Sequence, residues 1–196
     1  MKVSGAKVAK NRAALIATAK RLLQERGFGG AGVVEISREA GLTQGALYGQ
    51  FKSKDALAAA AVSKAFCDLA DSWRALGETA PGVLSAYLDT YLRESQHAHD
   101  ADAGCPIASC ASEIRRQDPA IGAAFTEGFR TMVELLQQAL PNDLPPEVAR
   151  QQALTFVSAM VGSVAIARDV EASEPDLSKE LLTAVRRELD GLARRA

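Results

Sequence analysis

Apolar residues recur at helical spacing along most of the chain, and glycines or prolines separate the segments in which they do so. Apolar side chains three or four positions apart lie on one face of a helix, so each segment predicts a helix with one buried side. The first predicted helix stops at Gly27, since glycine readily adopts the conformation that closes a helix. The predicted helices span residues 8–26, 33–40, 44–51, 54–76, 81–99, 106–116, 119–140, 146–170 and 177–194.

Prolines support the helix starts in the second half of the chain. A proline at or just before a helix start costs little, because its missing N–H has no partner there in any case. No alternating pattern indicates a strand, and the chain has no internal repeat or low-complexity tract. The predicted fold class is therefore all-α. The prolines at predicted starts are Pro81, Pro106, Pro119, Pro146 and Pro175.

The two shortest predicted helices, 33–40 and 44–51, are separated by a turn at Gly41. Helices of about two turns are unstable alone and must share a core. Leu47 and Phe51, four positions apart, supply it from the second helix, and Gly41 tolerates the positive φ that a tight turn needs. Thr43 and Ser53 are good N-caps for the helices that follow them. The pattern predicts a helix-turn-helix over about residues 33–51.

The outward face of the second short helix suits the major groove of DNA. Gln44 can hydrogen-bond base edges, and Tyr48 can reach a phosphate or a thymine methyl group. The lysines that flank residue 53 stand beside a helix N-terminus, which favours phosphate. The candidate DNA contacts are Arg38, Thr43, Gln44, Gly45, Ala46, Tyr48, Gly49, Gln50, Lys52 and Lys54.

The charge distribution agrees with a nucleic-acid-binding head. The net charge is −1, but residues 1–54 contain ten Lys or Arg and only three Asp or Glu, which leaves the remainder acidic. A basic end on an acidic protein is typical of DNA binding. The N-terminus has no apolar signal core, the longest nearly apolar run, 153–167, is too short to span a bilayer, and the three cysteines have no framework spacing. We expect a cytoplasmic protein without a membrane partner.

A motif in about the first sixty residues consists of Gly27-Phe28, Val33, Ile36-Ser37, Ala40-Gly41-Leu42-Thr43, Gly45-Ala46-Leu47-Tyr48, Phe51, Ser53-Lys54 and Leu57. This motif closely resembles the TetR family of repressors. The resemblance implies a homodimer whose two heads read a palindromic operator in double-stranded DNA and release it when a small-molecule effector enters the C-terminal part. By matching positions, it implies DNA contacts at Thr43, Gln44, Ala46, Tyr48, Gln50 and Lys54.

Three positions depart from the family pattern. The family usually has Thr or Ser where Gly32 stands, an aromatic residue or His at Gly49, and His or Tyr at Gln50. These departures affect operator affinity or preference rather than the fold. The rest of the chain matches the family in length and helical layout only.

The predicted domains are a DNA-binding head, residues 1–53, and a larger helical domain for ligand sensing and dimerisation, residues 54–196. The last two helices have apolar surfaces, and two such helices from each subunit would form a four-helix interface. The predicted interface residues are Leu154, Val157, Val161, Leu181, Val185 and Leu189. Aromatic and methionine residues predict a pocket for an amphipathic or aromatic effector. The candidate pocket residues are Phe66, Leu69, Trp73, Tyr87, Tyr91, Cys105, Cys110, Ile114, Phe125, Phe129 and Met132.

Other chemistries stay open at this point. Cys105 falls at a predicted helix N-terminus, which favours a thiolate, so a redox- or electrophile-sensing regulator that uses Cys105 and Cys110 is an alternative. His97, His99 and these cysteines match no closed zinc motif, and we predict no metal or cofactor. A small enzyme or metal-binding protein is the rival of another class, but the chain has no phosphate loop, nucleophile elbow or HExxH. The sequence does not fix whether the regulator represses or activates.

Overall fold

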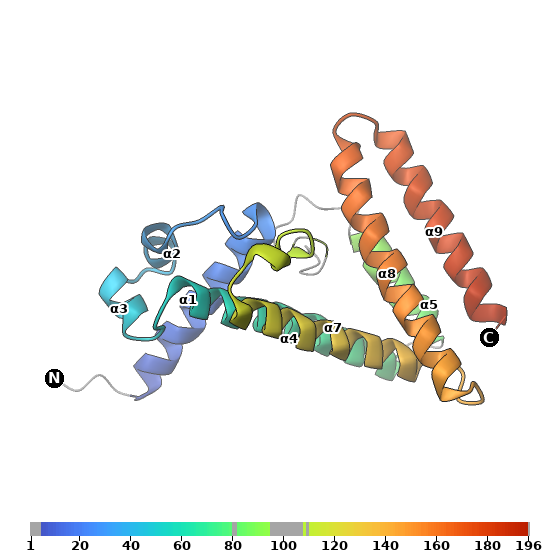
Figure 1. The fold of residues 1–196 in the computed structure, drawn as a ribbon, viewed down its shortest axis with the longest axis horizontal. Coiled ribbons are helices and arrows are strands. Elements are labelled where there is room, and N and C mark those ends of the chain that lie inside the picture. Colours follow the sequence, from blue (N-terminus) through green and yellow to red (C-terminus); the bar gives the residue numbers. More distant parts are fainter. Residues whose placement is uncertain (1–4, 80–81, 95–107, 109, 196) are drawn as a thin grey trace. The chain divides into compact units, whose positions relative to one another are not determined.

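The computed structural model describes residues 5–79, 82–94, 108 and 110–195, and this part of the chain is helical without strands (Figure 1). The all-α prediction is confirmed. The elements are α1 (Gly5–Arg26), α2 (Val33–Glu39), α3 (Gln44–Tyr48), α4 (Lys54–Thr79), α5 (Val83–Glu94), the 3-10 helix η2 (Ile114–Arg116), α7 (Pro119–Ala139), α8 (Pro146–Glu171) and α9 (Pro175–Arg195).

Most predicted helix bounds agree with the structure within a few residues, and one predicted helix is wrong over much of its length. The helix expected over 106–116 gives way to a turn at 111–113 and to η2, while residues 106, 107 and 109 lie outside the described part. The segment before Pro119 ends its helix, because a new helix, α7, begins at this proline. At the start of α7, the Asp118 carboxylate accepts the Ala120 N–H at 2.8 Å. Gln117 is accordingly extended, with φ −94° and ψ 170°.

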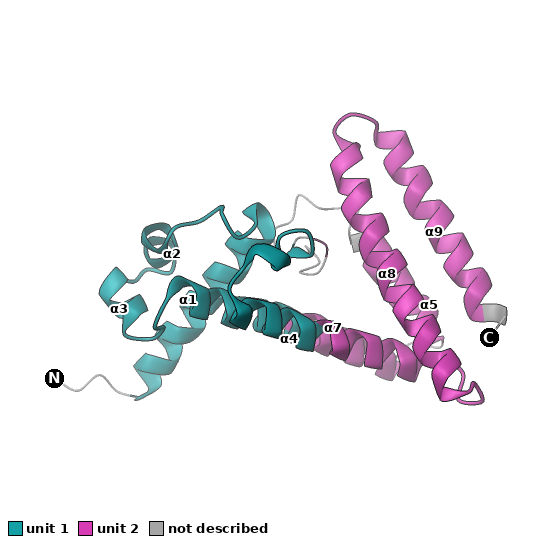
Figure 2. Ribbon diagram, viewed as in Figure 1, with its two compact units in different colours: residues 1–67, 109–128 teal, residues 68–108, 129–196 magenta. Residues whose placement is uncertain are grey.

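The chain packs as two compact units (Figure 2). Unit 1 consists of residues 1–67 and 109–128, and unit 2 of residues 68–108 and 129–196. The packing therefore does not divide at the predicted boundary after residue 53. The reason is that the first turns of α4 contribute Leu57 and Ala61 to the same core as Leu15, Ile36 and Leu47.

Unit 1 also holds the first turns of α7 against α4. The rings of Phe66 and Phe125 meet edge to face, with centroids 5.5 Å apart. A Cβ atom at Gly128 would lie 2.1 Å from the Phe66 ring, so the close approach of the two helices requires glycine at this position. The aromatic pair thus belongs to the packing of unit 1.

In unit 2, α8 and α9 lie side by side and α5 packs against both (Figure 1). Arg186 of α9 donates hydrogen bonds to Asp89 at 2.8 Å and to Ser85 at 2.9 Å on α5. Among the described residues, α8 is the one helix long and apolar enough to cross a membrane by length and composition. Some of its side chains, including Phe156, Met160 and Val164, are buried in the interior of unit 2.

Candidate nucleic-acid interface

The turn between α2 and α3 has the geometry that the sequence predicts. Gly41 has φ +68°, a left-handed conformation that favours glycine. The Leu42 N–H donates to the Ser37 carbonyl at 2.8 Å, and the Ala46 N–H donates to the Thr43 hydroxyl at 3.2 Å. Ser37 is buried where the helices approach, and its small side chain allows the close contact. Local sequence therefore sets the angle between the two short helices.

The second helix of the motif divides into a buried face and an exposed face. Leu47 has no exposed surface and Phe51 is buried, which confirms the inward pair at i and i+4. Tyr48 is 53% exposed, and Gln44 and Gly49 also lie on the surface. Since large aromatic side chains are normally buried, a tyrosine held outward on a rigid short helix indicates a contact surface.

The Arg12 side chain of α1 contacts two residues that lie just after the exposed helix α3. Its guanidinium donates to the Gln50 carbonyl at 3.0 Å and lies 4.2 Å from the centroid of the Phe51 ring. The first contact satisfies a carbonyl just after α3, and the second is a cation–π interaction. The sequence analysis did not predict this role, because no local pattern connects residues 38 positions apart.

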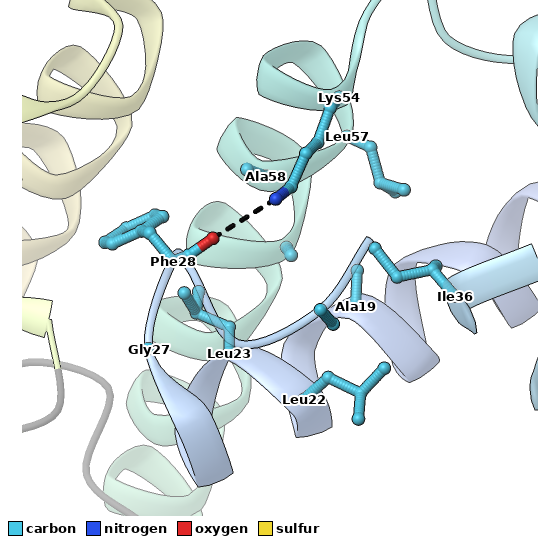
Figure 3. A pocket seen from close by; sticks show the side chains of 11 residues that line it. Ala19, Leu22, Leu23, Gly27, Phe28, Ile36, Lys54, Leu57 and Ala58 are labelled. Carbon is cyan, nitrogen blue, oxygen red and sulfur yellow. Dashed lines mark hydrogen bonds between the residues drawn. The ribbon is translucent and has the colours of Figure 1, made fainter. Parts of the chain in front are cut away.

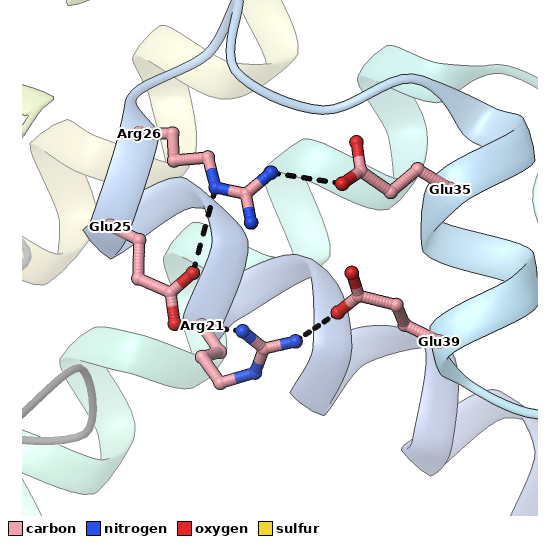
Figure 4. Close-up of polar contacts among 5 residues, drawn as sticks. All are labelled: Arg21, Glu25, Arg26, Glu35 and Glu39. Atoms are coloured by element: carbon pink, nitrogen blue, oxygen red, sulfur yellow. Dashed lines mark hydrogen bonds and ion pairs between the residues drawn. The ribbon is translucent and has the colours of Figure 1, made fainter.

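Ion pairs join α1 to α2 on the surface of unit 1 (Figure 4). Arg26 pairs with Glu35 at 2.9 Å, and Arg21 pairs with both Glu25 and Glu39. The hydrogen bonds that Arg21 donates to the Glu25 and Glu39 carboxylates raise the pKa of Arg21 above its usual value. Glu25, Glu35 and Glu39 are the three acidic residues in 1–54, so each carboxylate of the head is paired with an arginine of α1. Arg38 and Lys52 remain exposed.

Gly32 meets its expectation, whereas Lys54 departs from its expected role. Gly32 begins α2 without a side-chain cap, as its sequence predicts. Lys54, a predicted phosphate contact, is half-buried and donates to the Phe28 carbonyl at 3.3 Å (Figure 3). The Lys54 amine therefore points toward the loop between α1 and α2. The Phe28 carbonyl in that loop has no donor from a helix and accepts the hydrogen bond from the amine.

Unit 2 brings together a subset of the predicted pocket residues. Leu69, Trp73, Tyr91 and Met132 line a cavity with about 190 Å³ of empty volume. Tyr87 stacks on Trp73 with ring centroids 4.7 Å apart, and burial raises the pKa of its phenol. The other residues that line this cavity are Val157, Met160 and Val161. The sequence analysis did not predict Met160 as a lining residue, and it assigned Val157 and Val161 to the dimer interface.

The other pocket candidates lie elsewhere. Phe66 and Phe125 form the aromatic pair of unit 1, Ile114 and Phe129 are half-buried, and Cys110 is only 1% exposed. Cys105, His97 and His99 fall outside the described residues. Within the described part, no three His, Cys, Asp or Glu side chains gather in a way that could hold a metal ion.

The predicted interface residues also separate into two groups. Val157 and Leu189 are buried inside unit 2, so they cannot carry a contact with a partner subunit. Leu154 is exposed, and Val161, Leu181 and Val185 are half-buried. The sequence could not distinguish these groups, because α8 is apolar on several sides. Ile166, which is 54% exposed on α8, was not among the predicted residues.

Comparisons with known proteins agree with this architecture. Residues 15–61 match the model of the bacterial regulatory proteins of the tetR family, and residues 83–177 match the C-terminal domain of LmrA/YxaF-like transcriptional regulators. The repressor NemR of Escherichia coli is 28% identical over 133 residues, which span 65% of this chain and 66% of that protein. The regulator LmrA of Bacillus subtilis is 26% identical over 84% of this chain and 90% of its own length.

Solved structures show the same fold. The crystal structure of the reduced form of E. coli NemR has a TM-score of 0.75 and 24% identity, covering 90% of this chain and 95% of that chain. A TetR regulator from Legionella pneumophila has a TM-score of 0.77 and 18% identity, covering 98% of this chain and all of its own. Fold and site therefore define a helix-turn-helix protein. The chain belongs to the TetR family of bacterial transcriptional regulators.

Proposed function

We propose that this protein is a cytoplasmic, homodimeric repressor that binds a palindromic operator and releases it when a small apolar or aromatic molecule binds in unit 2. One observation carries the DNA-binding part of this proposal. Helix α3 is fixed in the head by buried Leu47 and Phe51 while it holds Tyr48 and Gln44 outward. A rigid helix with exposed aromatic and amide side chains can enter the major groove without first ordering itself.

Charge supports the same surface. The three acidic side chains of the head are paired with Arg21 and Arg26, so they do not oppose a phosphate backbone. Exposed Arg38 in α2 and Lys52 just after the motif supply sequence-independent contacts. The predicted DNA contacts thus divide into a base reader on α3, Gln44, and phosphate contacts on and around the same helix.

An exposed line of small and apolar residues on α8 supports dimerisation. Leu154, Ser158, Gly162 and Ile166 are spaced four apart and therefore follow one face of the helix. Ile166 is more than half exposed, which is unusual for isoleucine, and a Cβ atom at Gly162 would meet nothing within 4 Å. Small residues between larger apolar ones let helices from two subunits cross closely.

The cavity of unit 2 supports an apolar or aromatic effector. Its lining contains Trp73 and Tyr91 with methionine and aliphatic side chains, and no charged residue among those described. Methionines adapt to ligands of different shape. Helix α4 carries Leu69 and Trp73 of this cavity and Leu57 of the head core, so one helix connects the two functions. We propose that effector binding shifts α4 and changes the spacing of the two heads.

Substitutions on α3 separate base reading from general attachment. Tyr48→Ala is expected to weaken binding to operator and random duplex alike, because Tyr48 is proposed to contact the DNA backbone. Gln44→Ala is expected to weaken operator binding by about 1–3 kcal/mol and leave random duplex unchanged, because an amide hydrogen-bonds a base edge. Binding of both variants to both duplexes, measured by fluorescence anisotropy at one salt concentration, tests this. Equal losses for both variants on both duplexes would refute the division of roles.

The thiol-sensing alternative depends on Cys105, which lies outside the described residues, and on Cys110. Cys110 is buried in unit 1, and buried thiols in apolar surroundings react slowly. Cys67 is the exposed cysteine of the described residues, and it lies outside the helix-turn-helix motif. We propose reversible ligand binding in unit 2 as the signal, with thiol sensing through Cys105 as the alternative.

A further inference from the structure

The first turns of α1 project from the core of the head. Every residue from Gly5 to Lys10 is exposed, and Leu15 is the first described residue of the helix that is buried. Between them, Arg12 donates to the Gln50 carbonyl at 3.0 Å just after α3. At a rise of about 1.5 Å per residue, α1 continues for about 10 Å beyond this contact (Figure 1). The core of the head does not account for this extension of the helix.

The charge of this extension is opposite to the charge that a helix start favours. It carries Lys7 and Lys10, and the first acidic residue of the chain is Glu25. A helix N-terminus has a partial positive charge, so its first turns favour Asp or Glu and disfavour lysine. The two lysines therefore lower the stability of the turns in which they stand. Natural proteins break such local preferences mainly at functional sites.

The lysines stand on the side of α1 that carries the helix-turn-helix. Lys7 and Lys10 are three positions apart and share one face of the helix. Arg21, about three turns after Lys10, continues this face and pairs with Glu39, the last residue of α2. Because α3 follows α2 and lies against α1, the lysines continue the basic surface formed by exposed Lys52 and the residues around α3.

We propose that the first turns of α1 form an additional phosphate-binding site, in which Lys7 and Lys10 contact the DNA backbone beside the groove that α3 enters. This inference rests on the proposed function. Charge complementarity and continuity with the surface around α3 support DNA as the occupant. A lysine ammonium is a point charge, so it binds a phosphate without reading a base. The site therefore adds affinity rather than sequence preference, and it extends the contacts of each head past α3.

Salt titrations of DNA binding by the full-length protein test the site. The probes are the duplex that the protein selects from a random pool and an unselected duplex of equal length. Lys7→Gln/Lys10→Gln removes four phosphate contacts from a dimer, so the slope of log K against log salt should become shallower by about 3–4 on both probes. Affinity at moderate salt should fall at least about tenfold. Arg74→Gln/Lys179→Gln, which removes two exposed cations of unit 2, is the matched control and should leave the slope unchanged.

Phosphate-ethylation interference on the selected duplex separates contact from general attraction, with thermal unfolding used to check that the double variant is folded. Compared with the wild type, the variant should lose sensitivity to ethylation at about two phosphates of each half-site. An unchanged salt slope would overturn the proposal. A shallower slope with an unchanged interference pattern would overturn it too, since the lysines would then act only through net charge. Wild-type protein that binds neither duplex would contradict the proposed function itself, and this inference with it.

Discussion

Replacing Gly162 by arginine is expected to produce a folded monomer that no longer binds a palindromic operator tightly. A Cβ atom at this position would meet nothing within 4 Å in the subunit, so an arginine can leave the helix there without a clash at its Cβ. In the proposed dimer the same side chain would be buried between helices that approach to about 8–10 Å. Burying an unpaired charge there costs several kcal/mol, which is more than the packing of two closely crossing helices contributes to dimer stability.

Light scattering at micromolar concentration measures the expected change from dimer to monomer. Operator affinity should fall at least about a hundredfold, toward that of non-specific binding, because one head alone reads one half-site. Gly122→Arg is the matched control, since Gly122 also lies in a helix with open space at its Cβ but belongs to unit 1. A Gly162→Arg protein that stays dimeric would place the interface elsewhere.

Leu47→Ala is expected to lower the stability of the head by about 2–5 kcal/mol, the usual cost of truncating a fully buried leucine. Leu47 has no exposed surface and joins α3 to the core that Leu15, Ile36 and Leu57 complete. The helix is only five residues long, so it cannot persist without this anchor. Operator binding should be lost together with the ordered head, while the dimer survives.

Urea unfolding, combined with hydrogen exchange of the α2 and α3 amides, measures this loss. Gln44→Ala is the control, because an exposed substitution on the same helix normally changes stability by no more than about 0.5 kcal/mol. A change below about 1 kcal/mol for Leu47→Ala would show that α3 does not depend on this core.

Local signals in the sequence predicted the motif well. Gly41 adopts the positive φ that its position requires, and Thr43 caps α3. The Ser53 hydroxyl accepts the Ala56 N–H at 3.0 Å at the start of α4, again as expected. These features depend on residues within about four positions of one another, so a linear pattern contains them.

Long-range partners were not predictable in the same way. Glu113 contacts Phe28 from 85 positions away, and Lys54 turns to the same residue instead of to solvent. In unit 2, periodicity identified α8 as apolar but could not tell which of its sides faces inward, so Val157 was assigned to the interface although it is buried. Such choices are made by tertiary packing, which a pattern along one helix does not record.

Selection of binding sites from a random duplex pool, with purified full-length protein at moderate salt, tests the central claim most directly. The account predicts enrichment of a palindrome whose half-site centres lie about one helical turn of DNA apart, or a multiple of it, with conserved bases where α3 enters the groove. Folded, dimeric protein that enriches no sequence would contradict it, and would mean that the exposed face of α3 does not read DNA.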